Sequence, residues 1–186
     1  MACESLSRSR NLPCKIGFSG IKAVGFLNYT PLTLASEDIY NGLGLATQEI
    51  YRYELKNDGN TYEEDGVSDR NTSTTVYTGA LTIVLPLLDR ATRDEVKKMA
   101  YGRPQIFLEL FDGQVVIAGF EHGCELTSAK FATGGARKDM NGITLTFNTE
   151  EKQPLVFVGP AGITAYQDAI NSTDVITPGT GFPSGS

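Results

Sequence analysis

The stretch of residues 74–120 constrains the fold more than any other part of the chain. It has the pattern strand, helix, strand, turn, strand. In its first part, Thr74–Leu85, side chains alternate in character with a period of two, which is typical of a half-buried β-strand. Pro86 has no amide hydrogen to donate to a strand ladder, so we expect the strand to end there.

A helix is predicted over about residues 89–101. Asp89 is a good N-cap because its carboxylate can accept hydrogen bonds from the first free amides of a helix. Thr92 and Glu95 have the spacing of a capping box and offer a second possible start. Gly102, just before a proline, is a typical stop signal.

A β-hairpin is predicted after this helix. Two apolar runs, 105–111 and 114–120, are separated by Asp112-Gly113. This dipeptide favours a type I′ turn, because both central residues of such a turn need positive φ.

Weaker strand patterns occur on both sides of this central stretch. They cover residues 21–29, 47–56, 127–132, 143–147 and 155–158. A chain of 186 residues is long enough for one domain with a sizeable core. We therefore expect a mainly β domain over residues 19–158, with two packed antiparallel sheets in a sandwich or barrel and one flanking helix.

Both ends of the chain differ from this domain in composition. Residues 1–18 show no periodicity and are interpreted as an N-terminal arm. Residues 159–186 are rich in Gly, Pro, Ser and Thr, which indicates a C-terminal extension without long regular elements. Ile163, Tyr166 and Ile170 are too apolar for a pure linker, so either a disordered tail or a strap packed on a neighbouring subunit fits this segment.

Residues 57–71 are strongly acidic and are predicted to form a long loop between two strands. Loops of this length are uncommon in compact domains and are usually functional or mobile. Two interpretations stay open: a solvated flexible loop, or an arm that becomes ordered against another subunit. The candidate inter-subunit contacts in the loop and the extension are Asp58, Tyr62, Glu63, Glu64, Asp65, Asp69, Arg70, Ile163, Tyr166 and Ile170.

The charge and apolar patterns limit the classes of function. A net charge of −6 argues against a dedicated nucleic-acid-binding protein, although a wall that repels phosphate suits a channel through which DNA slides. No apolar run approaches the roughly 20 residues that span a bilayer, and the N-terminus has no signal-peptide pattern, so we expect synthesis in a cytoplasm. The three cysteines, Cys3, Cys14 and Cys124, are too few and too scattered for a disulfide framework or a common zinc motif, and are predicted to be free thiols.

The search for catalytic chemistry rests on a single histidine, His122. In a strand, His122 and Cys124 would share a face, so a thiol–imidazole pair with Glu125 nearby is one hypothesis. Gly119 and Gly123 instead favour a bend at the surface. We therefore predict no catalytic, cofactor or metal site, and a protein that is not an enzyme.

Several motifs between Thr75 and Glu151 resemble a family of virion structural proteins of tailed bacteriophages that have the tail-tube fold. They are most similar to the ring and tail-tube-like proteins of crAss-like phages and related prophages of Bacteroidetes. The segments that carry the resemblance are Tyr77–Asp89, Thr92–Glu95, Ala100–Arg103, Gly119–Leu126, Thr133–Phe147 and Glu150-Glu151, with a looser likeness at Ser19-Gly20-Ile21 and at the early cysteines.

This resemblance implies a structural role in the virion tail or the head–tail neck. Six or twelve copies would close into a ring, and one sheet of each would join those of its neighbours around a channel that DNA passes without specific binding. A long loop would reach an adjacent subunit or ring. The implied partners are further copies and neighbouring tail or neck proteins, with no cofactor and no membrane, and the protein would be made in the cytoplasm of the bacterial host.

The alternative is a monomeric β-sandwich that binds a protein or carbohydrate ligand. Such modules usually display exposed aromatic residues. This chain has no tryptophan, and most of its tyrosines lie within predicted strands, which weakens the alternative.

Overall fold

The computed structural model describes residues 10, 18–34, 39–42, 44–55, 58–171 and 175–177. The protein is mainly β, with two packed sheets and two helices, and the predicted sandwich is confirmed; neither sheet closes into a barrel. One sheet has six strands in the order β2-β10-β7-β6-β1-β3, and the other has four in the order β4-β5-β9-β8.

The elements have the following bounds. The strands of the six-stranded sheet are β1 (Ile21–Leu27), β2 (Ile39–Tyr40), β3 (Ile50–Glu54), β6 (Gln105–Leu110), β7 (Val115–Ala118) and β10 (Val156–Val158). Those of the four-stranded sheet are β4 (Thr61–Asp69), β5 (Thr74–Pro86), β8 (Glu125–Ala132) and β9 (Gly142–Glu151), and the helices are α1 (Arg90–Tyr101) and α2 (Pro160–Ala169). All named strand pairs are antiparallel except β10 with β2, which is parallel.

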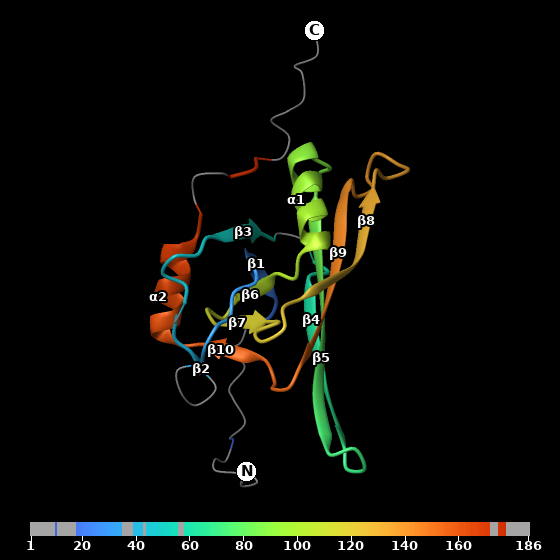
Figure 1. The fold of residues 1–186 in the computed structure, drawn as a ribbon. Helices are drawn as coiled ribbons and strands as arrows, with labels where there is room; N and C mark the ends of the chain where they lie inside the picture. Colours follow the sequence, from blue (N-terminus) through green and yellow to red (C-terminus); the bar gives the residue numbers. More distant parts are fainter. Residues whose placement is uncertain are drawn as a thin grey trace.

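The six-stranded sheet is buried on both faces. Phe26 and Ile106 point into a first core that fills the space between the two sheets. Their neighbours Leu27 and Phe107 point into a second core on the opposite face, which α2 covers. Figure 1 shows the resulting layers, with α2, the six-stranded sheet and the four-stranded sheet following one another across the molecule.

The four-stranded sheet is buried on one face only. Along β5, Leu81, Ile83 and Leu85 face the first core, and the residues between them face outward. The alternation that predicted this strand therefore corresponds to one buried side and one outward-facing side.

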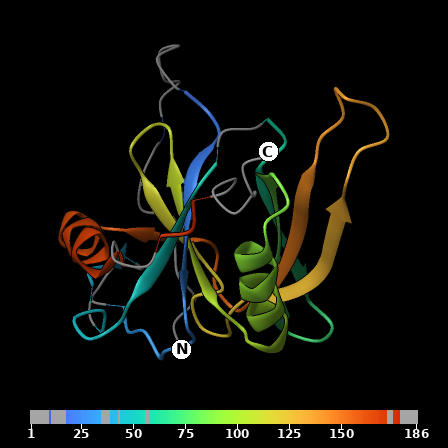
Figure 2. The same cartoon turned by 90° about the horizontal axis from the view of Figure 1, so that it is seen from above.

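Helix α1 begins where the sequence predicts. The carboxylate of Asp89 accepts hydrogen bonds from the amides of Ala91 (3.0 Å) and Thr92 (3.2 Å). Thr92 lies inside the helix and is buried, so the second possible start is not used. Val96 anchors the helix in the first core, and seen from above the helix lies close to the four-stranded sheet (Figure 2).

The turn at Asp112-Gly113 differs from the prediction. Gly113 has positive φ, at 89°, but Asp112 is not among the residues with positive φ, so the turn is not type I′. The amide of Gly113 donates to the carbonyl of Leu110, and the amide of Leu110 donates to the carbonyl of Gln114. This is the pattern of a three-residue hairpin loop, in which only the last residue needs the left-handed conformation.

The prediction of a long loop over residues 57–71 is wrong for most of that range. Thr61–Asp69 forms strand β4, which pairs with β5 along its whole length. An edge strand with an exposed face needs few apolar side chains, because backbone pairing holds it in place. The acidic composition of this strand therefore gave no strand pattern in the sequence.

The predicted domain end at residue 158 is also wrong. Residues 160–169 form helix α2, and its Tyr166 is buried in the second core. Pro160 does not prevent the helix, because it occupies the N-terminal turn, where no intrahelical partner exists for an amide hydrogen. The domain therefore includes α2, and the fold has two helices rather than one.

Some predictions lie largely outside the described residues. Of the N-terminal arm, only Arg10 and Phe18 are described, and Cys3 and Cys14 are not. Cys124 is free and buried, as predicted.

Candidate functional site

The side of the four-stranded sheet that faces away from the first core, called here the outer face, is an uncovered surface of regular structure. The registers of the strand pairs define its members. They are Thr61, Glu63, Asp65, Val67 and Asp69 of β4; Thr74, Val76, Thr78, Ala80, Thr82 and Val84 of β5; Glu125, Ser128, Lys130 and Ala132 of β8; and Thr144, Thr146, Asn148 and Glu150 of β9.

The chemistry of the outer face is anionic and without aromatic groups. Its ionisable side chains are five carboxylates and one ammonium, namely Glu63, Asp65, Asp69, Glu125 and Glu150 against Lys130. Threonine is the commonest of its other residues. Such a face repels phosphate and has no ring on which a nucleotide base could stack.

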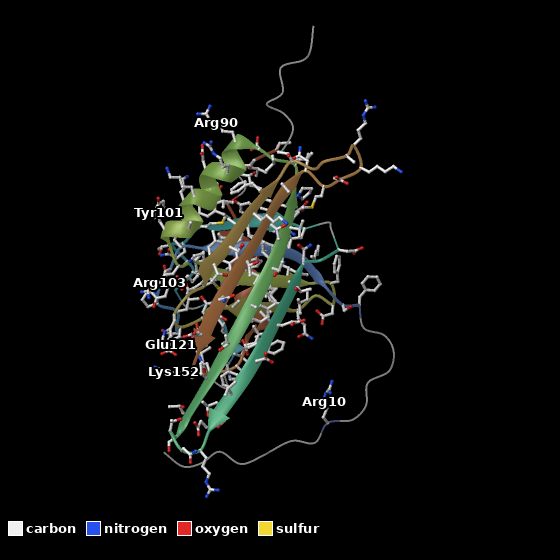
Figure 3. All side chains as sticks on the ribbon, turned by 90° about the vertical axis from the view of Figure 1, so that its right-hand side faces the viewer. Arg10, Arg90, Tyr101, Arg103, Glu121 and Lys152 are labelled. Atoms are coloured by element: carbon white, nitrogen blue, oxygen red, sulfur yellow. The ribbon has the colours of Figure 1, made fainter. Side chains whose placement is uncertain are left out.

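The outer face is bounded by two open edges. Within the described chain, β4 and β8 each pair on one side only. The β4–β5 hairpin also extends well beyond the rest of the molecule (Figures 1 and 3). Val67 and Val76 lie opposite each other on this extension and are 64% and 40% exposed, and Phe131 on β8 is 47% exposed.

Five of the predicted contact residues lie where another molecule could reach them. Glu63, Asp65 and Asp69 are exposed on the outer face, and Asp58 and Arg70 are exposed in turns. Asp69 also stabilises the hairpin tip, since its carboxylate accepts a hydrogen bond of 2.7 Å from the amide of Asn71.

Tyr62 and Glu64 point the other way, into their own chain. The Tyr62 hydroxyl donates to Glu64 Oε2 at 2.7 Å, and the amide of Leu155 donates to Glu64 Oε1 at 2.9 Å. Burial raises the pKa of Tyr62, and the bond to Glu64 adds to this effect. These two residues hold β4 onto the domain, and their role as inter-subunit contacts stays a prediction.

The three predicted contacts in the C-terminal segment are also internal. Tyr166 is 1% exposed and stacks on Phe107 with ring centroids 5.0 Å apart. Ile163 and Ile170 are partly buried and pack on the second core. The apolar character that suggested a strap on a neighbour is instead explained by this packing within the chain.

A partly buried ion pair supports this packing. Glu109 accepts two hydrogen bonds from the guanidinium of Arg52, at 2.7 and 3.0 Å, and one from the Tyr166 hydroxyl at 2.8 Å. Burial opposes the charge on Glu109, but the bonds from Arg52 and Tyr166 outweigh it, so the pKa of Glu109 is lowered. The paired carboxylate is therefore ionised and satisfied.

The thiol–imidazole hypothesis finds no support in the geometry. Cys124 is fully buried, and its thiol donates to the carbonyl of Ala118 at 3.3 Å. Burial raises the pKa of this thiol, which opposes formation of a nucleophilic thiolate. His122 and Glu125 are exposed, so the three residues do not form one site.

A second polar site, not predicted from the sequence, lies where β9 ends beneath the turn that follows β7. Glu151 Oε1 accepts hydrogen bonds from the amides of Glu121 (3.1 Å) and His122 (2.9 Å). Glu151 Oε2 is buried and has no hydrogen-bond partner within the described residues. Burial raises the pKa of Glu151. The sequence contained one signal that Glu151 is buried: its position continues the inward-facing series of Phe147 and Thr149.

An open cleft of about 2430 Å³ lies beside α1. Tyr51, Arg52 and Tyr53 of β3 line one side, Glu95 and Lys98 of α1 line another, and residues 175–177 also contribute. This is the place where the alternative binding module would hold a ligand.

Searches against models of protein families, curated proteins and solved structures found no match to this chain. Among the described residues, no helix is both long and apolar enough to cross a membrane.

Proposed function

We propose that this chain is a structural subunit of a ring in the tail or head–tail neck of a tailed bacteriophage. In this proposal the four-stranded sheets of neighbouring copies join edge to edge, and the outer faces together line a channel for DNA. The observation that carries the proposal is the outer face itself, which is long, uncovered, anionic and open at both edges.

Edge pairing gives a physical reason for the open strands. Unpaired strand edges favour aggregation unless they are blocked or paired, and joining β4 of one copy to β8 of the next leaves the four-stranded sheet without a free edge in a closed ring. The same joint would cover Phe131, which a monomer leaves half exposed.

The charge of the outer face suits a channel for DNA. Negative walls repel phosphate, so a duplex moves along the lumen without being held. The resemblance to ring and tail-tube-like proteins points to the same role and supplies the expected number of copies, six or twelve.

The test is assembly of the full-length chain, measured by light scattering after gel filtration and by negative-stain electron microscopy. We expect closed rings with a central channel. Phe131→Asp should prevent ring closure and leave a folded subunit, because it places a charge in the proposed joint. The matched control is Phe157→Asp, since Phe157 is 48% exposed but belongs to the six-stranded sheet.

Two results would count against the proposal. One is a monomer at the highest soluble concentration, and the other is unchanged ring formation by Phe131→Asp. A monomer that binds a peptide or a sugar in the cleft beside α1 would favour the alternative, a β-sandwich binding module.

A further variant tests the lumen. Glu63→Lys combined with Asp65→Lys reverses two charges of the outer face, and these rings should bind duplex DNA in a salt-sensitive manner, whereas wild-type rings should not. Equal DNA binding by both would show that the outer face does not line the channel.

A further inference from the structure

We infer that Glu121, His122 and Glu151 form a binding site for a divalent transition-metal ion such as Zn²⁺. One carboxylate oxygen of each glutamate and a ring nitrogen of His122 lie within 4.8 Å of one another. One imidazole with two carboxylates is a donor set that suits zinc, and three protein ligands leave a position for water. The sequence alone predicted no metal site.

Glu151 provides the independent observation. It is only 6% exposed, and its Oε2 has no hydrogen-bond partner within the described part of the chain. No ion pair found among the described residues includes Glu151. A buried carboxylate without a countercharge is costly, and a bound cation would supply the missing charge.

The backbone already orients this carboxylate toward the other two side chains. Glu151 Oε1 accepts from the amides of Glu121 and His122, so the carboxylate lies directly beneath the turn that carries both. Gly119 and Gly123 have positive φ, and a Cβ at Gly123 would lie 2.5 Å from the carbonyl oxygen of Arg103, so a larger residue would disturb this turn. Glu121 and His122 are exposed at the surface, beside the buried carboxylate.

Lys152 competes for one of the ligands. Its ammonium lies 3.4 Å from Glu121 Oε1, and both residues are at the same side of the molecule in Figure 3. Removing this ammonium frees a ligand oxygen of Glu121. It also removes a positive charge that would repel a metal ion. The proposed site therefore predicts one substitution that strengthens metal binding as well as several that weaken it.

The experiment follows the imidazole signals of His122 by nuclear magnetic resonance in the untagged full-length chain. Because His122 is the only histidine, its ring signals report this site even if cysteines elsewhere take up zinc. We expect one equivalent of Zn²⁺ to shift them, and Mg²⁺ and Ca²⁺, which prefer oxygen ligands, to leave them unchanged.

The variants distinguish zinc binding at the proposed site from nonspecific zinc binding to surface carboxylates. Glu151→Gln and Glu121→Gln should each weaken zinc binding more than about tenfold. Glu150→Gln should have no effect, because it makes the same chemical change one residue away on the opposite face of β9. Lys152→Ala should strengthen binding, and His122→Ala should remove the part of the zinc-dependent heat in calorimetry that belongs to this site.

Three outcomes would overturn the inference. They are His122 signals that zinc leaves unchanged, equal effects of Glu150→Gln and Glu151→Gln, and weaker binding by Lys152→Ala. Glu151 also lines a cavity of about 10 Å³ together with Glu64, which is close to the size that one water molecule needs. In any of these cases a buried water there is the better partner for Glu151 Oε2.

Discussion

The two sheets of this sandwich differ in what they leave for function. The six-stranded sheet carries a core on each face, and its half-buried carboxylate, Glu109, is paired with Arg52 and Tyr166. The four-stranded sheet carries a core on one face, and its buried carboxylate, Glu151, has an oxygen with no hydrogen-bond partner among the described residues. The first sheet is thus covered on both faces, whereas the second has an open face and a buried carboxylate oxygen without a hydrogen-bond partner in the described chain.

The largest expected effect on stability comes from a substitution in the second core, on the α2 side of the six-stranded sheet. Tyr166→Ala removes a buried ring from the second core and the hydroxyl that donates to Glu109. We expect a loss of about 3–5 kcal/mol in the free energy of unfolding, measured by urea denaturation. A loss below about 1 kcal/mol would show that α2 is not an integral part of the domain.

The next prediction compares the loss of stability caused by substitutions on the two sides of the four-stranded sheet. Leu145→Ala, on the inner side of β9, should cost about 2–5 kcal/mol, because it leaves a cavity in the first core. Its neighbour Thr144 lies on the outer face, and Thr144→Ala should stay within about 0.5 kcal/mol. Similar losses from both substitutions would mean that the outer face is covered by something else.

The third prediction concerns the paired carboxylate and pH. Glu109→Gln leaves Arg52 with only its more exposed carboxylate partner, Glu54, and we expect a loss of about 1–3 kcal/mol at neutral pH. Because the folded-state pKa of Glu109 is lowered, its contribution is complete above the pKa of the unfolded chain and is lost as pH falls through the folded-state value. The stability difference between wild type and Glu109→Gln should therefore shrink toward zero in acid, as urea denaturation at several pH values can show. A difference that is constant across this range would contradict the assignment.

The smallest expected effect has the opposite sign. In metal-free buffer at neutral pH, Glu151→Gln removes an uncompensated buried charge and keeps an oxygen that can accept from the amides of Glu121 and His122. We expect thermal unfolding to show a gain of roughly 1 kcal/mol. The control is Glu150→Gln, which changes an exposed group and should have no effect. A clear loss from Glu151→Gln would mean that the charge is compensated in the folded protein.

Local patterns were sufficient for most of the fold. The alternation in Thr74–Leu85, the cap at Asp89 and the apolar runs that became β6 and β7 all depend on neighbours a few residues apart. They therefore predicted β5, α1 and a hairpin between β6 and β7 correctly. β4 was missed because an exposed edge strand lacks the apolar signal and is held by pairing with β5.

The candidate site was less predictable than the fold. The acidic residues Glu63 and Asp65 were singled out, but only the register with β5 places them on one outer face and turns Glu64 inward. Tyr166 and Glu109 are separated by more than 50 residues, so no local pattern could indicate that they share a hydrogen bond.

The sequence by itself determined the fold class, the central strand and the flanking helix, because these follow from periodicity and caps. The tertiary structure decided which faces are buried. It assigned the C-terminal segment to the second core, left the outer face of the four-stranded sheet open, and brought Glu151 beneath the turn at Glu121 and His122. These results depend on contacts between residues that are distant in the chain, and the free energy of such contacts is set by packing and pairing that a local pattern does not contain.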